Sequence, residues 1–332
     1  MTATTSQLLR FAFAVCVIGC AAASRADEPI WDANKVEMIR EQLAPGVYAF
    51  YARDAKALNV SGGAAANSGG LIVGSRGALQ IETMLDERLF NQVRTLVREV
   101  TQVPLLYAVN TSFHGDHSYG NMYLSPQTKI IQHEFTKSYI DQHLAEDKAF
   151  MIQYFGTGRG IEEIKARTGD ILVRAGQSIT IDLGGKQVQI IDFGYAQTGG
   201  DLFIWEPESR VLWTGNPIIA TKPSLPWLLN GHLVETLETL QKVYAFLPAD
   251  ARIIPGHGVV ISREDLRWHI DYLSAVKRNV QAAINDGLTL EQTVQKVQMP
   301  EFSGYVLFGW VHPSLNVPAA YKDLSSVRSS GK

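Results

Sequence analysis

Hydrophobic residues recur in short runs along the first half of the chain, and glycine-rich turns separate these runs. Runs of this length between glycines are typical of β-strands. Five apolar residues then recur every three or four positions between Leu85 and Val100, which predicts an amphipathic helix over 85–100. The strands are expected at 46–52, 69–74, 77–83, 104–110 and 129–133, with helical and looping chain from there to about residue 166.

The second half repeats this layout. Strands are expected at 170–175, 178–183, 186–194, 201–207, 210–216 and 251–258, with a helix at 232–247. Ser262 is a suitable N-cap for a second helix, whose apolar face runs from Leu266 to Ile284 and which ends at Gly287. Shorter helices are expected at 289–297 and near 316–324.

Strand runs bounded by helices, twice over, predict an α/β fold in which two packed sheets carry helices on their outer faces. No linker rich in Pro, Gly or Ser divides the chain. We therefore expect one domain over 27–300. Residues 301–332 are expected to be a C-terminal extension packed on the same domain, irregular apart from its final helical piece.

The stretch NTSFHGDHSYGN, residues 110–121, places His114, Asp116 and His117 in one short turn after a buried strand. Imidazole and carboxylate groups are ligands that zinc favours, and a catalytic zinc keeps about three of them plus water. Loops at strand ends often carry functional groups. The alternative is a surface loop in which the histidines merely hydrogen-bond the aspartate.

This stretch resembles the NTHxHxDHxxGN signature of the metallo-β-lactamase superfamily, with Ser112 in place of the first histidine. AQTGGDLFIWEPESRVLWTGN (196–216) is similar to the family's AHTxGDxxxxxPxxxVLxxGD, and IIPGHG (253–258) matches its closing histidine motif. Upstream, NSGGLIVGSRGALQIETM (67–84) also fits, with Glu82 where Asp is usual. The resemblance covers about residues 45–260 and implies a four-layer αββα sandwich.

The resemblance also implies two adjacent metal sites. The first would use positions Ser112, His114, Gln197 and Asn216, of which only His114 keeps a metal-binding side chain, so His114 is an additional candidate ligand. The second would use Asp116, His117 and His257, all of which are present, and Asn216 stands where a shared Asp would bridge the ions. Serine, glutamine and asparagine are neutral, weak ligands, so a dinuclear centre is not expected.

Two functional hypotheses follow. In the first, one zinc on Asp116, His117 and His257 activates water in a hydrolase for an ester, lactone, amide or phosphoester. Asp116 and His114 would then carry catalysis, with His114 as a proton shuttle or a hydrogen-bond donor to the developing oxyanion. In the second, the chain is a metal-poor pseudoenzyme that acts as a periplasmic binding or accessory protein.

Other candidates rest on weaker patterns. Trp227 and Leu228 follow the Asn216 block where family members place pocket-lining loops, although they suit a core equally well. Arg159 lies in a glycine-rich loop, 153–160, that could close over an anionic substrate or be a plain loop. Ser112 as a nucleophile activated by His114 is disfavoured, because residues two apart on a strand rarely reach attack geometry. The remaining histidines fit no ligand pattern: His133, His143, His232, His269 and His312.

The first 26 residues have the pattern of a secretory signal peptide: a polar start with Arg10, a short apolar run and small residues ending at Ala26. We expect cleavage after Ala26 and a periplasmic or secreted protein. The sequence VIGC also fits a lipoprotein box, in which Cys20 would be the lipidated first residue.

Composition narrows the partners. The only two cysteines, Cys16 and Cys20, lie in the leader, so cleavage at Ala26 leaves histidine and carboxylate as the strong zinc ligands. Cleavage of the leader removes two of the 30 basic residues and none of the 33 acidic ones, so the formal net charge changes from −3 to −5. The sequence has no basic patch, so nucleic acid is not an expected partner. We expect a small-molecule substrate instead. No transmembrane helix is expected after cleavage.

Overall fold

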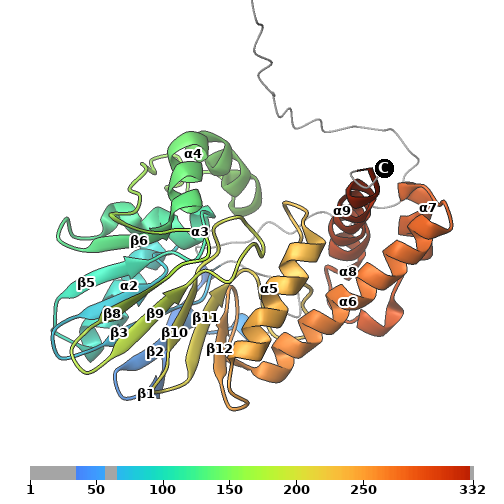
Figure 1. Cartoon of the computed structure of the whole chain (residues 1–332). Helices are drawn as coiled ribbons and strands as arrows, with labels where there is room; N and C mark the ends of the chain where they lie inside the picture. Colours follow the sequence, from blue (N-terminus) through green and yellow to red (C-terminus); the bar gives the residue numbers. More distant parts are fainter. Residues whose placement is uncertain (1–34, 57–65, 330–332) are drawn as a thin grey trace, which may run out of the picture.

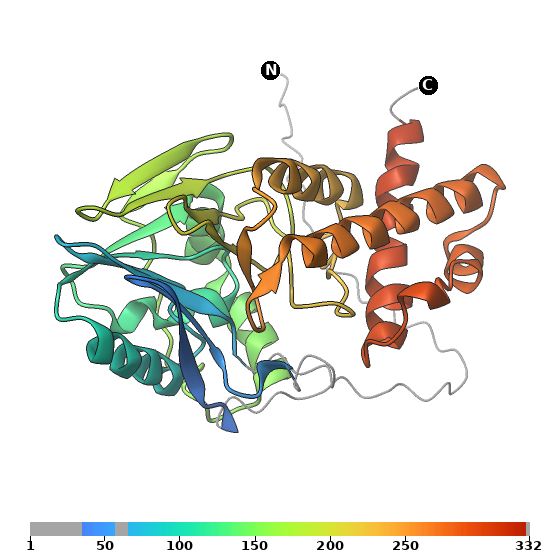
Figure 2. The same cartoon turned by 90° about the horizontal axis from the view of Figure 1, so that it is seen from below.

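The computed structural model describes residues 35–56 and 66–329. The predicted leader, 1–26, lies outside the described residues. Two β-sheets face one another, and helices lie beside them (Figures 1 and 2). The α/β sandwich predicted from the strand and helix pattern is therefore confirmed.

The first sheet has seven strands that follow one another in chain order. Its first four strands are antiparallel, and from the fourth strand onward the neighbours are parallel. The parallel strands end at the same edge, which is where their connecting segments begin. The strands are β1 (Met38–Ala44), β2 (Val47–Ala52), β3 (Gly69–Val73), β4 (Ala78–Ile81), β5 (Leu105–Val109), β6 (Lys129–His133) and β7 (Ile171–Val173).

The second sheet has six strands in the order β13-β12-β11-β10-β9-β8. Only β11 and β12 are parallel neighbours, and a helix connects them. The strands are β8 (Ser178–Asp182), β9 (Gln187–Ile191), β10 (Phe203–Glu206), β11 (Val211–Gly215), β12 (Arg252–Pro255) and β13 (Ile261–Ser262).

Helices lie beside both sheets. Helix α2 (Glu87–Val100) accompanies the first sheet and buries Leu89, Phe90 and Val93, while α5 (Leu233–Phe246) and α6 (Arg263–Asn285) lie beside the second (Figures 1 and 2). Helix α4 (Glu134–Phe155) stands next to the short α3 (Gly115–Ser118), which leads into the 3₁₀ helix η2 (Tyr119–Tyr123) (Figure 1).

A tryptophan joins the two sheets. The fully buried Trp213 of β11 donates a 3.0 Å hydrogen bond from Nε1 to the backbone oxygen of Gly69 on β3. Its ring lies so close to Gly70 that a Cβ there would overlap it. Glycine at position 70 thus allows the indole to lie directly against the opposite sheet, which fixes how the two sheets align.

The C-terminal extension is more regular than the sequence analysis predicted. After α7 (Leu290–Lys296) and η3 (Pro300–Phe302), the chain forms α8 (Phe308–Trp310), a π-helical turn η4 (Val311–Asn316) and α9 (Val317–Ser329). Helix α9 packs against α5, α6 and α7. Pro313 and the wide π-helical turn interrupt the usual spacing of apolar residues, so the continuous helical course was not visible in the sequence.

Buried hydrogen bonds hold this extension to the domain. His312 Nε2 donates to the backbone oxygen of Val297 at 2.8 Å, so Nδ1 is an acceptor, and it accepts from the Tyr272 hydroxyl at 2.9 Å. That hydroxyl in turn accepts from Asn316 Nδ2 at 2.9 Å. None of the helices over 35–56 and 66–329 is long and apolar enough to span a membrane.

Candidate metal centre and pocket

The candidate site lies where three strands end, β5 of the first sheet and β11 and β12 of the second. The chain leaves β5 and reaches Asp116 and His117 on α3, while Asn216 follows β11 and His257 follows β12. The first two residues therefore come from the first sheet and the other two from the second. A parallel pairing of β11 with β12 brings Asn216 and His257 to the same edge. Gly256 carries no Cβ, which lets Asn216 lie directly against it.

Asp116, His117 and His257 form a buried group of potential metal ligands whose donor atoms all lie within 4.8 Å of one another. Asp116 Oδ2 is 3.1 Å from His257 Nε2 and 3.5 Å from His117 Nε2. Ligand atoms about 2.1 Å from a tetrahedral zinc are about 3.4 Å apart. The spacing and the chemistry of these three groups therefore fit one small divalent cation.

Hydrogen bonds turn both imidazoles toward Asp116. His117 Nδ1 donates to Glu82 Oε1 at 2.9 Å, and His257 Nδ1 donates to the backbone oxygen of Ala66 at 3.2 Å. Each ring thus presents Nε2 to the centre. A carboxylate behind a histidine ligand fixes its tautomer and raises its basicity. From the sequence, Glu82 was visible only as a departure from the family pattern, and this role was not predicted.

The electrostatics of the three ligands also suit a cation. Burial opposes the charge of both Asp116 and His117, yet their mutual attraction outweighs it. The imidazoles of His117 and His257 hold the pKa of Asp116 well below its usual range. Burial lowers the pKa of His117, but Asp116 and Glu82 together raise it to about 9. A proton on His117 supplies positive charge that a bound cation would replace.

The other predicted positions surround this centre without completing a second one. Asn216 Oδ1 lies 3.1 Å from His117 Nε2. Ser112 is fully buried, and its Oγ lies 3.1 Å from Nδ1 of His114 rather than facing the pocket. Gln197 Nε2 donates to the backbone oxygen of Trp227 at 3.3 Å. His114, proposed above as an additional ligand, is not part of the three-residue group.

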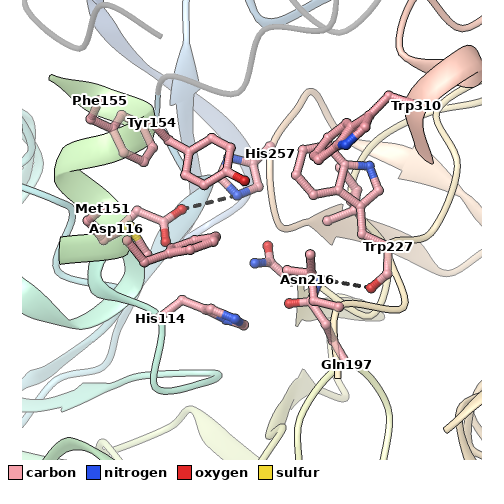
Figure 3. Close-up of a pocket in the computed structure, with 13 residues that line it drawn as sticks. His114, Asp116, Met151, Tyr154, Phe155, Gln197, Asn216, Trp227, His257 and Trp310 are labelled. Atoms are coloured by element: carbon pink, nitrogen blue, oxygen red, sulfur yellow. Dashed lines mark hydrogen bonds and ion pairs between the residues drawn. The ribbon is translucent and has the colours of Figure 1, made fainter. Parts of the chain in front are cut away.

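His114 faces the pocket from its floor (Figure 3). Its ring centroid is 6.3 Å from that of His117. Burial lowers the pKa of His114 to about 4, so the ring is neutral near pH 7. Since Nδ1 is engaged by Ser112, the remaining nitrogen, Nε2, is the one left for a ligand. A serine nucleophile and its base would make the same hydrogen bond, but Ser112 is fully buried and is not among the described residues that line the pocket.

The pocket above these residues is largely apolar. It has about 540 Å³ of empty space, its open mouth included. Met151, Tyr154 and Phe155 of α4 line one side, and Trp227 and Trp310 line the other (Figure 3). Phe150 and Leu229 also line the pocket. Trp227 and Trp310 meet edge to face at 5.3 Å.

Two predicted pocket residues lie elsewhere. Leu228 is buried and does not line the pocket, whereas its neighbour Trp227 does. The backbone N–H of Leu228 donates a 3.0 Å hydrogen bond to Asn316 Oδ1. Arg159 lines a separate polar hollow beside Asp86 and Glu87 at the start of α2. Arg159 is thus not among the described residues that line the pocket, and its role as a lid stays a prediction.

Of the aromatic lining, only Trp227 was predicted from the sequence. The α4 residues that form it, and Trp310 of α8, have no spacing that distinguishes them from core residues. Trp310 reaches the pocket only because the C-terminal extension folds back onto the domain. The other histidines are distant from the three-ligand group: His133 caps α4, His269 bonds its own helix, and His312 holds the extension.

No protein-family model matches the chain. Among solved structures, the metallo-β-lactamase from Pontibacter korlensis is 15% identical, with a TM-score of 0.56 over 71% of this chain and 99% of that one. The DIM-1 metallo-β-lactamase is 16% identical, with a TM-score of 0.56 over 72% of this chain and 97% of its own. VMB-1 is 16% identical, with a TM-score of 0.53 over the same shares, 72% and 97%.

The chain therefore has the fold of the metallo-β-lactamase superfamily, as its motifs predicted. At these identities the likeness extends to the fold alone. Function has to be argued from the residues of the site.

Proposed function

We propose that the protein is a hydrolase that uses one zinc ion, held by Asp116, His117 and His257, to cleave an ester, lactone, amide or phosphoester in a small molecule. The observation that carries this proposal is the convergence of three buried ligand atoms within 4.8 Å, two of which belong to pocket-lining residues, Asp116 and His257. When bound, such an ion polarises a carbonyl or phosphoryl group and makes water acidic enough to attack near neutral pH.

The chain's own residues would prepare the reaction. Glu82 and the Ala66 carbonyl orient the two histidines, so they need little rearrangement to bind the ion. His114 is neutral near pH 7, and its Nε2 can donate a hydrogen bond to a developing oxyanion or take up a proton, depending on the tautomer. The aromatic walls exclude water around the reacting group, which strengthens these interactions.

A second candidate is a metal-poor binding protein. Ser112, Gln197 and Asn216 stand where the resemblance implies ligands of a first metal, and each of the three makes a hydrogen bond within the protein instead. A polar network of this kind can persist without catalysis. The two candidates differ in whether Asp116, His117 and His257 bind metal and support turnover.

Zinc binding is the direct test. If the site binds zinc only in the native state, zinc at 100 times its Kd raises the free energy of unfolding by about 2.7 kcal/mol, seen as a higher Tm. Asp116→Ala should lose this shift, whereas Asp271→Ala, an exposed aspartate on α6, should keep it. A wild-type protein with no zinc-dependent shift and less than about a tenth of an equivalent of metal contradicts the proposal.

Activity separates the two candidates. A panel of ester, lactone, amide and phosphoester substrates is run on the wild type and on a triple variant, Ser112→His, Gln197→His and Asn216→Asp. Turnover by the wild type that Asp116→Ala abolishes supports the single-zinc hydrolase. Turnover only in the triple variant supports the binding protein.

We also propose that the protein is exported and cleaved after Ala26. The support is the sequence pattern of the leader alone. N-terminal sequencing of protein from a periplasmic fraction should begin at Asp27. A blocked, lipidated terminus at Cys20 would instead indicate a lipoprotein.

A further inference from the structure

Gln197 presents a buried acceptor at the pocket wall. The residue is 3% exposed, and its Nε2 donates to the Trp227 carbonyl. Because a carbonyl can only accept, this bond fixes which end of the amide faces Trp227. The other end, Oε1, is buried and has no hydrogen-bond donor among the residues that the structure describes.

An unsatisfied acceptor in such a place is costly for the empty protein. A buried polar group without a partner loses its hydration and gains nothing in return. Gln197 lines the same pocket as His114, which lies across from it (Figure 3). A ligand that brings an N–H or O–H group to Oε1 would recover the missing hydrogen bond.

The remaining walls specify the body of that ligand. Trp227 and Trp310 offer flat apolar surfaces on one side, and Tyr154 and Met151 face them across the pocket (Figure 3). The described residues that line the pocket include no lysine or arginine. Away from the metal centre, an anionic group would therefore find no basic side chain in the pocket wall to pair with. A β-lactam antibiotic carries such a carboxylate, so it suits this pocket poorly.

We propose that the pocket binds an uncharged molecule with a flat apolar group, which lies against Trp227 and Trp310, and with an N–H or O–H donor directed at Gln197 Oε1. Secondary amides with aromatic or other apolar groups have this chemistry. The assignment of such a molecule as the substrate rests on the proposed hydrolase function, whereas its binding does not.

A matched pair of probes tests the donor. Benzanilide carries an amide N–H, and deoxybenzoin has the same outline with a methylene in that position. Binding to the full-length protein is measured by tryptophan fluorescence and by ligand-observed NMR, with chelator and again with zinc. We expect the wild type to bind benzanilide about five- to tenfold more tightly or better, in line with one buried hydrogen bond.

Two variants separate the donor contact from general packing. Gln197→Met keeps the length of the side chain and removes the acceptor, so benzanilide and deoxybenzoin should then bind about equally. Trp310→Ala should weaken both probes and leave their ratio unchanged. Thermal unfolding verifies that both variants are folded. A third probe, 4-carboxybenzanilide, should bind at least tenfold more weakly than benzanilide.

The proposal is overturned if the two neutral probes bind equally to the wild type, if Gln197→Met retains the preference, if neither probe binds up to its solubility limit, or if the carboxylate binds best. Failure of the hydrolase function has a different signature. If no substrate is turned over but the pair is discriminated through Gln197, the pocket assignment stands and the protein is a binding protein.

Discussion

Asn316 fastens the C-terminal extension to the pocket, and its removal should cost both stability and pocket order. The side chain is fully buried. Its Oδ1 accepts from Leu228 N at 3.0 Å, and its Nδ2 donates to the Pro226 carbonyl at 2.8 Å. These two backbone groups flank Trp227, so one asparagine holds the chain on both sides of a pocket residue.

The magnitude follows from the groups left behind in Asn316→Ala. Two buried backbone groups lose their partner, and each unsatisfied group costs about 1–3 kcal/mol. The Tyr272 hydroxyl keeps its bond to His312, so it adds little. We expect the free energy of unfolding to fall by about 2–6 kcal/mol, which is a large part of the stability of a typical domain.

Urea unfolding followed by circular dichroism measures this change, and tryptophan fluorescence reports on Trp227. Ser303→Ala is a matched control, because this exposed serine of the same extension bonds only the Pro300 carbonyl at 2.7 Å. The control should change stability by less than about 0.5 kcal/mol. A loss under about 1 kcal/mol in Asn316→Ala, with an unchanged m-value, would refute the reasoning that this residue holds the loop.

Three further predictions concern single contacts. Burial raises the pKa of Asp147 from 3.8 to about 7, so its folded form prefers the proton and the wild type loses stability as pH rises from 4 through 7. Asp147→Asn should not lose stability in this way, so by pH 8 its free energy of unfolding should exceed that of the wild type by up to about 4 kcal/mol. Urea unfolding with chelator measures this difference, and a difference that does not change with pH would contradict the prediction. Glu82→Gln should weaken zinc binding about 10- to 100-fold, measured by competition with a chelator, since His117 loses the carboxylate that orients it. Gly70→Ala should lower the free energy of unfolding by about 1–3 kcal/mol, because its methyl group would overlap Trp213; unchanged stability would show that the sheets can shift.

Local patterns in the sequence predicted most elements of the fold, but not the edge strands β1 and β13. Asp86 caps α2, and Ser262 forms a capping box with Asp265 at the start of α6, where the sequence placed the helix start. These signals are local because a cap and an apolar face depend on neighbours in the chain. The extension after residue 300 was predicted less well, since Pro313 and a π-helical turn conceal its periodicity.

The candidate site divides in the same way. Asp116 and His117 belong to one motif, and His257 belongs to another, so the sequence could propose them as a group. It could not reveal the buried oxygen of Gln197 or the position of Trp310. Both depend on how segments far apart in the chain pack together, and neither has a spacing of its own. In the irregular loop at 222–229, no periodicity could tell which of two neighbouring residues faces the pocket.

The placement of the three ligands across both sheets has a consequence for how the protein folds. Asp116 and His117 depend on the first sheet, and His257 on the second. Either sheet could assemble its own strands without creating a place for a cation. The three ligands meet only when the sheets dock around Trp213. In a refolding experiment, tight metal binding should therefore appear only when the two sheets dock. It should appear later than the secondary structure.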